Sequence, residues 1–266
     1  MPGPRDKTVW ARLAWFVAGL FLLQAAPAAA GPFGDWSAVV VAGDWHAHSG
    51  GPSEAFDNAR HDVVQALERV GFSPTNLRQF SVRPERYKDE GLGKSEPQAI
   101  YNALADLSAR AQGGCLVYFS SHGAPAGVVV DQQFLPPGVL AQMLNTTCGQ
   151  RPTVVIVSAC FSGVFVPALA GPNRMVLTAA RPDRSSFGCG EADKYPYFDQ
   201  CVLESLPHAG DFAALGRTVQ ACVAARETKE GMKPPSEPQL FIGGGLKPLL
   251  PLYSLAVSPG GPGGNN

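Results

Sequence analysis

The sequence has no excess of charge of either sign. It contains 21 Lys and Arg residues against 22 Asp and Glu residues, and charged residues make up only 16% of the chain. The sequence also contains no local run rich in lysine and arginine. The composition therefore gives no electrostatic reason to expect binding to nucleic acid.

Three sequence patterns are also missing. The cysteines do not form paired Cys-x-x-Cys motifs of the kind that bind structural zinc. No internal repeat is visible, and after the first thirty residues no hydrophobic run is long enough to cross a bilayer. With 45% hydrophobic residues, the remaining chain is expected to form one domain of roughly 230 residues, with no membrane span.

The N-terminal thirty residues have the features of a secretory signal peptide. A basic front is followed by an apolar stretch over residues 13–26, and the small residues Ala28 and Ala30 precede Gly31. We therefore expect residues 1–30 to be removed and the protein to be exported, either to a periplasm or as a secreted protein. The alternative is an uncleaved membrane anchor, although the apolar stretch is shorter than the 20 or so residues that a span needs.

Export permits disulfide bonds, and the chain has six cysteines: Cys115, Cys148, Cys160, Cys189, Cys201 and Cys222. Their pairing stays open, because connectivity does not follow from spacing. Cys222 lies on the apolar stripe of a predicted helix, where a buried core cysteine is expected.

Strands and helices are predicted to alternate along residues 31–257. Strands are expected over residues 36–42, 76–82, 115–121, 153–159, 174–179 and 239–242, and helices over 56–70, 95–111, 139–144 and 211–226. Ser95 is the expected N-cap of the second helix. Alternation of this kind predicts an α/β fold, a three-layer α/β/α sandwich with a mainly parallel central sheet. The tail over residues 258–266 is rich in Pro and Gly, which predicts disorder.

Two of the predicted strands end next to a reactive side chain. His122 follows the apolar run CLVYFSS, and Cys160 follows the apolar run TVVIVSA. Residues just past the carboxyl ends of parallel strands line one crevice. The pattern therefore predicts an imidazole and a thiol in the same crevice, which is what a cysteine nucleophile with a general base requires.

These motifs resemble the legumain family of caspase-like, clan CD cysteine peptidases, in an exported, bacterial-type form. Five stretches carry the resemblance: VVVAG at 39–43, NARH at 58–61, SHG at 121–123, SAC at 158–160 and TAARPDRSS at 178–186. The resemblance implies a caspase-like fold and a cysteine endopeptidase acting on peptide or protein substrates without a cofactor. Cys160 would be the nucleophile, His122 the general base and acid, and the amides of Gly123 and Cys160 the oxyanion hole.

The resemblance also implies a specificity pocket for asparagine or aspartate before the cleaved bond. Its residues would be Asn58, Arg60, His61, Ser185, Ser186 and Asp199. Alternatively, Arg60 and His61 simply cover a solvated helix face. The chain has Ser158 and Phe161 where the legumain pattern has glutamates, which argues for an altered pocket.

Other readings stay open. Asp44, His46 and His48 are residue types that bind Zn²⁺, so a zinc hydrolase is one rival, although a loop at the mouth of the cleft is favoured. A transamidase or peptide ligase would use the same cysteine and histidine. A catalytically silent caspase-like binding protein would retain the fold without turnover.

Overall fold

The computed structural model describes residues 31–256, together with residues 1 and 3. The predicted signal peptide over residues 1–30 and the predicted tail over residues 258–266 thus lie outside the described residues, apart from those two positions. Within the described part of the chain, no helix is both long and apolar enough to cross a membrane.

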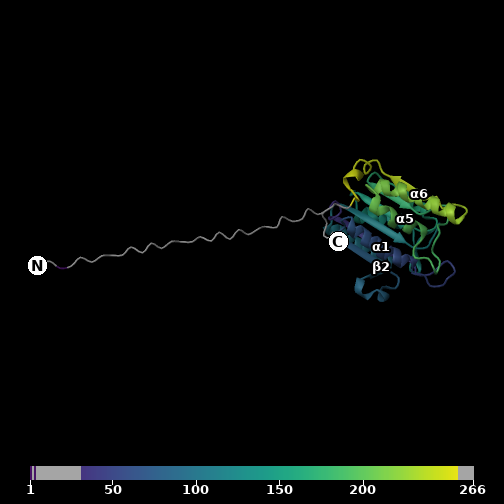
Figure 1. Ribbon diagram of the computed structural model, residues 1–266, viewed down its shortest axis with the longest axis horizontal. Helices are drawn as coiled ribbons and strands as arrows, with labels where there is room; N and C mark the ends of the chain where they lie inside the picture. The colour runs from purple at the N-terminus through teal and green to yellow at the C-terminus, as the bar shows by residue number, and fades with distance from the viewer. Residues whose placement is uncertain (2, 4–30, 257–266) are drawn as a thin grey trace.

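A seven-stranded sheet forms the centre of the molecule (Figure 1), in the order β10-β9-β8-β4-β1-β2-β3. Its strands are β1 (Trp36–Ala42), β2 (Leu77–Ser81), β3 (Gly93–Lys94), β4 (Gly114–Ser120), β8 (Thr153–Ser158), β9 (Arg174–Thr178) and β10 (Gln239–Ile242). Neighbouring strands are parallel, except that β10 runs antiparallel to β9. The predicted mainly parallel sheet is therefore confirmed.

Helices cover both faces of this sheet. One face carries α1 (Ala55–Arg69), α5 (Tyr197–Ser205) and α6 (Phe212–Glu230), and the other carries α2 (Pro97–Arg110), α3 (Pro137–Thr147) and α4 (Phe165–Leu169). Side chains alternate along the strands, so Ala38 and Val40 of β1 face the first layer while Val39 and Val41 face the second. The three-layer α/β/α sandwich is thus confirmed.

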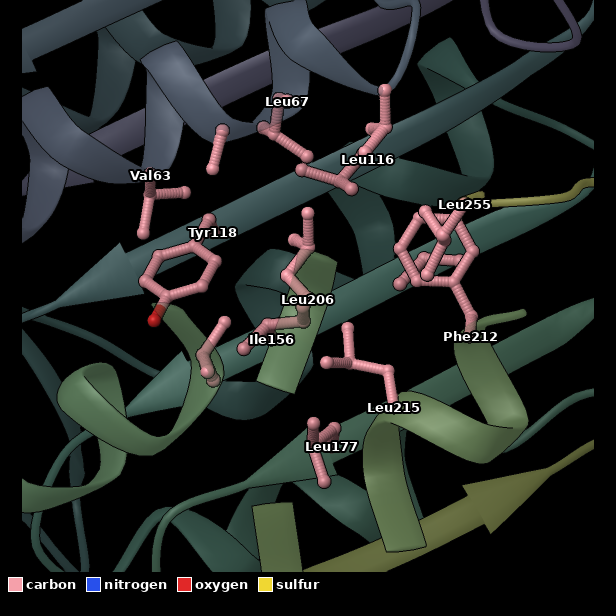
Figure 2. Close-up of a cluster of buried hydrophobic side chains, with 14 of the residues drawn as sticks. Val63, Leu67, Leu116, Tyr118, Ile156, Leu177, Leu206, Phe212, Leu215 and Leu255 are labelled. Atoms are coloured by element: carbon pink, nitrogen blue, oxygen red, sulfur yellow. The ribbon is translucent and has the colours of Figure 1, made fainter. Parts of the chain in front are cut away.

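In the core under α1, α5 and α6, apolar side chains at helical spacing pack on the apolar side chains of the strands (Figure 2). Val63 and Leu67, one turn apart on α1, lie over Tyr118 and Leu116 of β4, and Leu215 of α6 lies over Leu177 of β9 on the same face of the sheet. Residues three or four apart share one helix face, which is why the helical apolar period predicted α1 well. Within residues 31–256, six short 3₁₀ segments join the larger elements: Pro74–Asn76, Pro84–Arg86, Lys88–Glu90, Ser162–Val164, Leu206–His208 and Leu250–Leu252.

Several local predictions were wrong. α2 begins at Pro97 with Glu96 as N-cap, and the Ser95 hydroxyl instead donates to the carbonyl of Ala42 at 2.7 Å. Cys222 is not a free core residue, because it forms a disulfide with Cys201, with a Cα–Cα distance of 5.7 Å. A second disulfide joins Cys115 of β4 to Cys148 at the end of α3.

Helices α4 and α5 and strand β3 were not predicted. A small antiparallel sheet of β5 (Gly123–Ala124), β6 (Gly127–Val130) and β7 (Gln133–Leu135) was also missed. The small sheet begins directly after His122 and folds back on it, because the N–H of Val129 in β6 donates to the His122 carbonyl at 2.9 Å.

Candidate active site

The ends of β4 and β8 place His122 and Cys160 at equivalent positions. The two strands are adjacent and parallel, and Ser120 of β4 pairs with Ser158 of β8. His122 and Cys160 each lie two residues beyond this pair. Both are half-buried, so each is shielded by protein yet open to solvent on one side. The structure thus brings the two residues to neighbouring strand ends.

Gly123 lies against the backbone of Cys160. A Cβ atom at Gly123 would lie 2.3 Å from the Cys160 carbonyl oxygen and 2.9 Å from the Ala159 Cβ. Only glycine allows so close an approach. The segment that carries His122 is therefore in direct contact with the segment that carries the thiol.

A strained turn follows Cys160. Phe161 has φ 58° and ψ 11°, in the left-handed region that a bulky side chain rarely adopts. Its N–H donates to the carbonyl of Arg184 at 2.7 Å, and a 3₁₀ segment starts at Ser162. Strain of this kind persists only where the surroundings hold it, and it is concentrated at functional sites. Cys160 therefore lies between the end of β8 at Ser158 and this turn.

The sulfur of Cys160 is held by one neighbouring residue, Ser186. The backbone N–H of Ser186 donates to Sγ at 3.2 Å, and Sγ lies 3.5 Å from the Ser186 carbonyl oxygen and 3.6 Å from its hydroxyl. Ser186 was predicted to line the specificity pocket, and its position beside the thiol places it next to any bond that the thiol attacks. Ser185 is exposed on the same segment.

His122 is oriented by a backbone carbonyl. Its Nε2 lies 2.9 Å from the carbonyl oxygen of His46, and its ring makes a T-shaped contact with the Phe56 ring, with centroids 5.0 Å apart. Sequence reasoning missed this partner, because a backbone carbonyl belongs to every residue and leaves no pattern in the sequence.

Two loops lie beside His122 and Cys160 and contact each other: residues 44–53 after β1 and residues 181–196 after β9. The Ser53 hydroxyl donates to the carbonyl of Gly190 at 3.1 Å, and Ser49 is hydrogen-bonded to Glu191. The Asn58 side chain donates to the carbonyl of Lys194 at 3.1 Å. Asn58, predicted to line the pocket, thus ties α1 to the second loop.

Cys189, the other free cysteine, lies in the second of these loops. Burial, followed by the neighbouring charge of Cys160, raises the pKa of Cys189 to about 11. At neutral pH its thiol therefore stays protonated, and the thiol form is a poor nucleophile.

Arg60 lies neither on a solvated face nor beside Ser186. Its side chain is 0% exposed, and it pairs with Asp57 at 3.1 Å and with Glu90 at 2.8 Å. It also hydrogen-bonds Gln79 of β2, which is two strands away from β4 in the sheet. His61, half-exposed, pairs with the same Glu90 at 3.2 Å. The structure thus does not bring these two residues together with Ser185 and Ser186.

Replacing Arg60 with alanine should lower the free energy of unfolding by about 3–5 kcal/mol, because it leaves the buried Asp57 carboxylate without its cation. Urea unfolding would measure this. His61→Ala is the matched control, because His61 is half-exposed and its loss should cost less than about 1 kcal/mol. An unchanged stability together with altered cleavage specificity in Arg60→Ala would instead place Arg60 in the substrate pocket.

Asp199, the remaining predicted pocket residue, is 0% exposed. Its carboxylate accepts hydrogen bonds from the hydroxyls of Ser120 at 2.7 Å, Ser158 at 2.8 Å and Tyr118. It therefore joins the ends of β4 and β8 beneath His122 and Cys160. Burial raises the pKa of Asp199 to about 6, although the three hydroxyls oppose this by stabilising the charged form.

This shift predicts a dependence of stability on pH. Because the folded pKa is above the unfolded value of 3.8, the native state binds more protons than the unfolded state between pH 4 and 6. The contribution of Asp199 to the free energy of unfolding is therefore full below about pH 4 and is lost as pH rises through 6. This lowers the free energy of unfolding by about 3 kcal/mol. Urea unfolding at pH 4–6.5 should show this fall in wild type relative to Asp199→Asn; parallel curves would contradict it.

Asp44 and His46 bind each other, with the Oδ1 and Nδ1 atoms 2.7 Å apart, while His48 is exposed. Within residues 31–256, one group of His, Cys, Asp and Glu ligand atoms is close enough to hold a metal ion: Cys201, Glu204 and Cys222. Two of its sulfur atoms are joined in a disulfide, so they do not offer the thiolates that bind metal.

Comparison with known proteins agrees with this geometry. Residues 93–214 match the Peptidase C13 family, which is the legumain family. The matched segment contains His122, Cys160, Ser186 and Asp199. Among solved structures, caspase-1 from Spodoptera frugiperda has a similar fold, with a TM-score of 0.57 and 15% sequence identity. That similarity covers 80% of this chain and 88% of the caspase chain. No curated protein sequence gives a match.

Proposed function

We propose that the chain is a legumain-family cysteine endopeptidase that cleaves peptide bonds through Cys160 and His122. The observation that carries the proposal is the equivalent position of the two residues beyond adjacent parallel strands, with Gly123 in contact with the Cys160 backbone. The Peptidase C13 match over the segment that contains both residues supports it.

The reaction follows from these groups. His122 takes the proton of the Cys160 thiol, and the sulfur attacks the substrate carbonyl carbon. The N–H groups of Gly123 and Cys160 stabilise the oxyanion, and His122 returns the proton to the leaving amine. Water then attacks the acyl-enzyme, with His122 again as base, and releases the acid and free Cys160.

The test combines labelling with product analysis. A peptide chloromethyl ketone should alkylate Cys160, as mapped by mass spectrometry, and a peptide-library digest should yield cleaved products. Enrichment of asparagine or aspartate before the cleaved bond would support the specificity that the resemblance implies. Labelling without cleavage would indicate a silent binding protein, and amide products in the presence of an added amine would indicate a transamidase.

We further propose that the protein is exported. The two disulfides, Cys115–Cys148 and Cys201–Cys222, are consistent with an oxidising compartment. Intact-mass measurement of protein from the native host should give a chain that begins at Gly31. A mature chain that still begins at Met1 would contradict this and indicate a membrane anchor.

A further inference from the structure

The loop after β1 carries a carboxylate with three donors on one oxygen. Oδ1 of Asp44 accepts from the N–H of Trp45 at 2.6 Å and from the N–H of His46 at 3.0 Å. The same oxygen lies 2.7 Å from Nδ1 of His46, which must therefore donate its hydrogen to it. Asp44 thus holds both the peptide group and the side chain of His46.

The carbonyl of this same residue holds the ring of His122. A carbonyl oxygen only accepts, so the 2.9 Å contact requires a hydrogen on Nε2 of His122. A neutral imidazole carries one ring hydrogen, which leaves Nδ1 of His122 unprotonated and able to accept a proton. The His46 carbonyl therefore selects the tautomer in which the ring acts as a base through Nδ1.

We infer that Asp44 is a positioning residue for His122, acting through the backbone of His46. This rests on the proposed peptidase function. Two hydrogen bonds link the Asp44 carboxylate to the imidazole through the backbone of His46: the His46 N–H donates to the carboxylate, and the His46 carbonyl accepts from Nε2 of His122. Loss of the carboxylate frees the Trp45–His46 peptide group and the His46 side chain, so the His46 backbone can shift and the His122 ring loses a fixed position for the acceptor that sets its tautomer. A displacement of about 1 Å at a reacting group costs about 10²-fold in rate.

The remainder of the loop does not depend on Asp44. His46 forms a bridge with Pro52, the N–H of Ala47 donates to Gly51 at 2.7 Å, and the N–H of Ser53 donates to Trp45 at 2.9 Å. The guanidinium of Arg83 also packs on the Trp45 ring at 4.4 Å. The effect of removing the carboxylate should therefore be local, without unfolding the domain.

The experiment compares Asp44→Ala with Asp44→Asn on the full mature chain. Asp44→Ala should lower kcat about 10–100-fold with KM nearly unchanged, because the base is misplaced while the pocket is intact. Asp44→Asn keeps an oxygen acceptor for both N–H groups and should recover most of kcat. Asp106→Ala is the matched control, because Asp106 is exposed on α2. His46→Ala keeps the backbone carbonyl that contacts His122, so its kcat should fall less than that of Asp44→Ala.

Alkylation of Cys160 by iodoacetamide across pH is the second readout, and it does not require peptidase activity. Its pH profile should shift in Asp44→Ala and stay near wild type in Asp44→Asn. If Asp44→Ala is too unstable to purify, ¹⁵N NMR of wild type should show hydrogen on Nε2 of His122.

Three results would each overturn the inference. The first is a wild-type kcat and alkylation profile in Asp44→Ala, and the second is an equal loss of kcat in Asp44→Ala and Asp44→Asn. The third is a hydrogen on Nδ1 of His122. None of these results affects the assignment of Cys160 as nucleophile, which chloromethyl ketone labelling tests separately.

Discussion

Cys160→Ala and His122→Ala should each lower kcat/KM by at least about 10³-fold. Cys160→Ala has no sulfur to form the acyl-enzyme, and His122→Ala has no base to activate it. Because the two residues act as a unit, the double variant should be little worse than either single variant. Peptide-cleavage rates would measure this, with thermal melting to show that each variant is folded.

Cys189→Ala is the matched control for this pair. It also removes a free thiol from the loops around the crevice, but one whose raised pKa keeps it protonated at neutral pH. It should keep kcat/KM within about twofold of wild type, as a residue outside the proposed dyad does. Residual activity above about a tenth of wild type in either Cys160→Ala or His122→Ala would contradict the assignment of the dyad.

Gly123→Ala should lower kcat/KM by about 10²-fold or more. The new methyl group would lie 2.3 Å from the Cys160 carbonyl oxygen, a backbone atom that no side-chain rotation can move aside. The backbone at Cys160 or at Gly123 must therefore shift, and both residues supply N–H groups to the proposed oxyanion hole. Loss of one such donor costs about 10²–10³-fold in rate.

The matched control for this variant is Gly138→Ala. Gly138 lies in helix α3, and a Cβ there has nothing within 4 Å. This variant should keep full activity and gain up to about 1 kcal/mol in the free energy of unfolding, because alanine favours a helix over glycine. If Gly123→Ala kept kcat/KM within about threefold of wild type, Gly123 would not belong to the oxyanion hole.

The order of the main elements was predictable from the sequence because each has a strong local pattern. The β1, β4, β8 and β9 strands are continuous apolar runs, as buried parallel strands are. Helix α1 shows its apolar residues at helical spacing. Alternation of such segments leads to a parallel sheet, and His122 and Cys160 could be assigned to one crevice because both follow strands of that sheet.

Helix α5 and the small β5–β7 sheet were not predictable in this way. α5 has nine residues, too few for a clear helical period, and β5 has two residues. Such short segments are stabilised by the surfaces on which they pack rather than by their own sequences. Pairing of Cys201 with Cys222 also depends on packing, because it joins two helices that only tertiary structure brings together.

The surroundings of the charged motif residues were decided by tertiary structure alone. By itself, the motif at residues 58–61 suits either a pocket or a solvated face. Arg60 is buried because Gln79 and Glu90, from two other segments, join Asp57 of its own helix around it. Asp199 is buried because hydroxyls from β4 and β8 meet it. The sequence determined which reactive side chains follow which strands. Contacts between distant segments decided which polar groups are covered, because a charge can be buried only where its partners meet it.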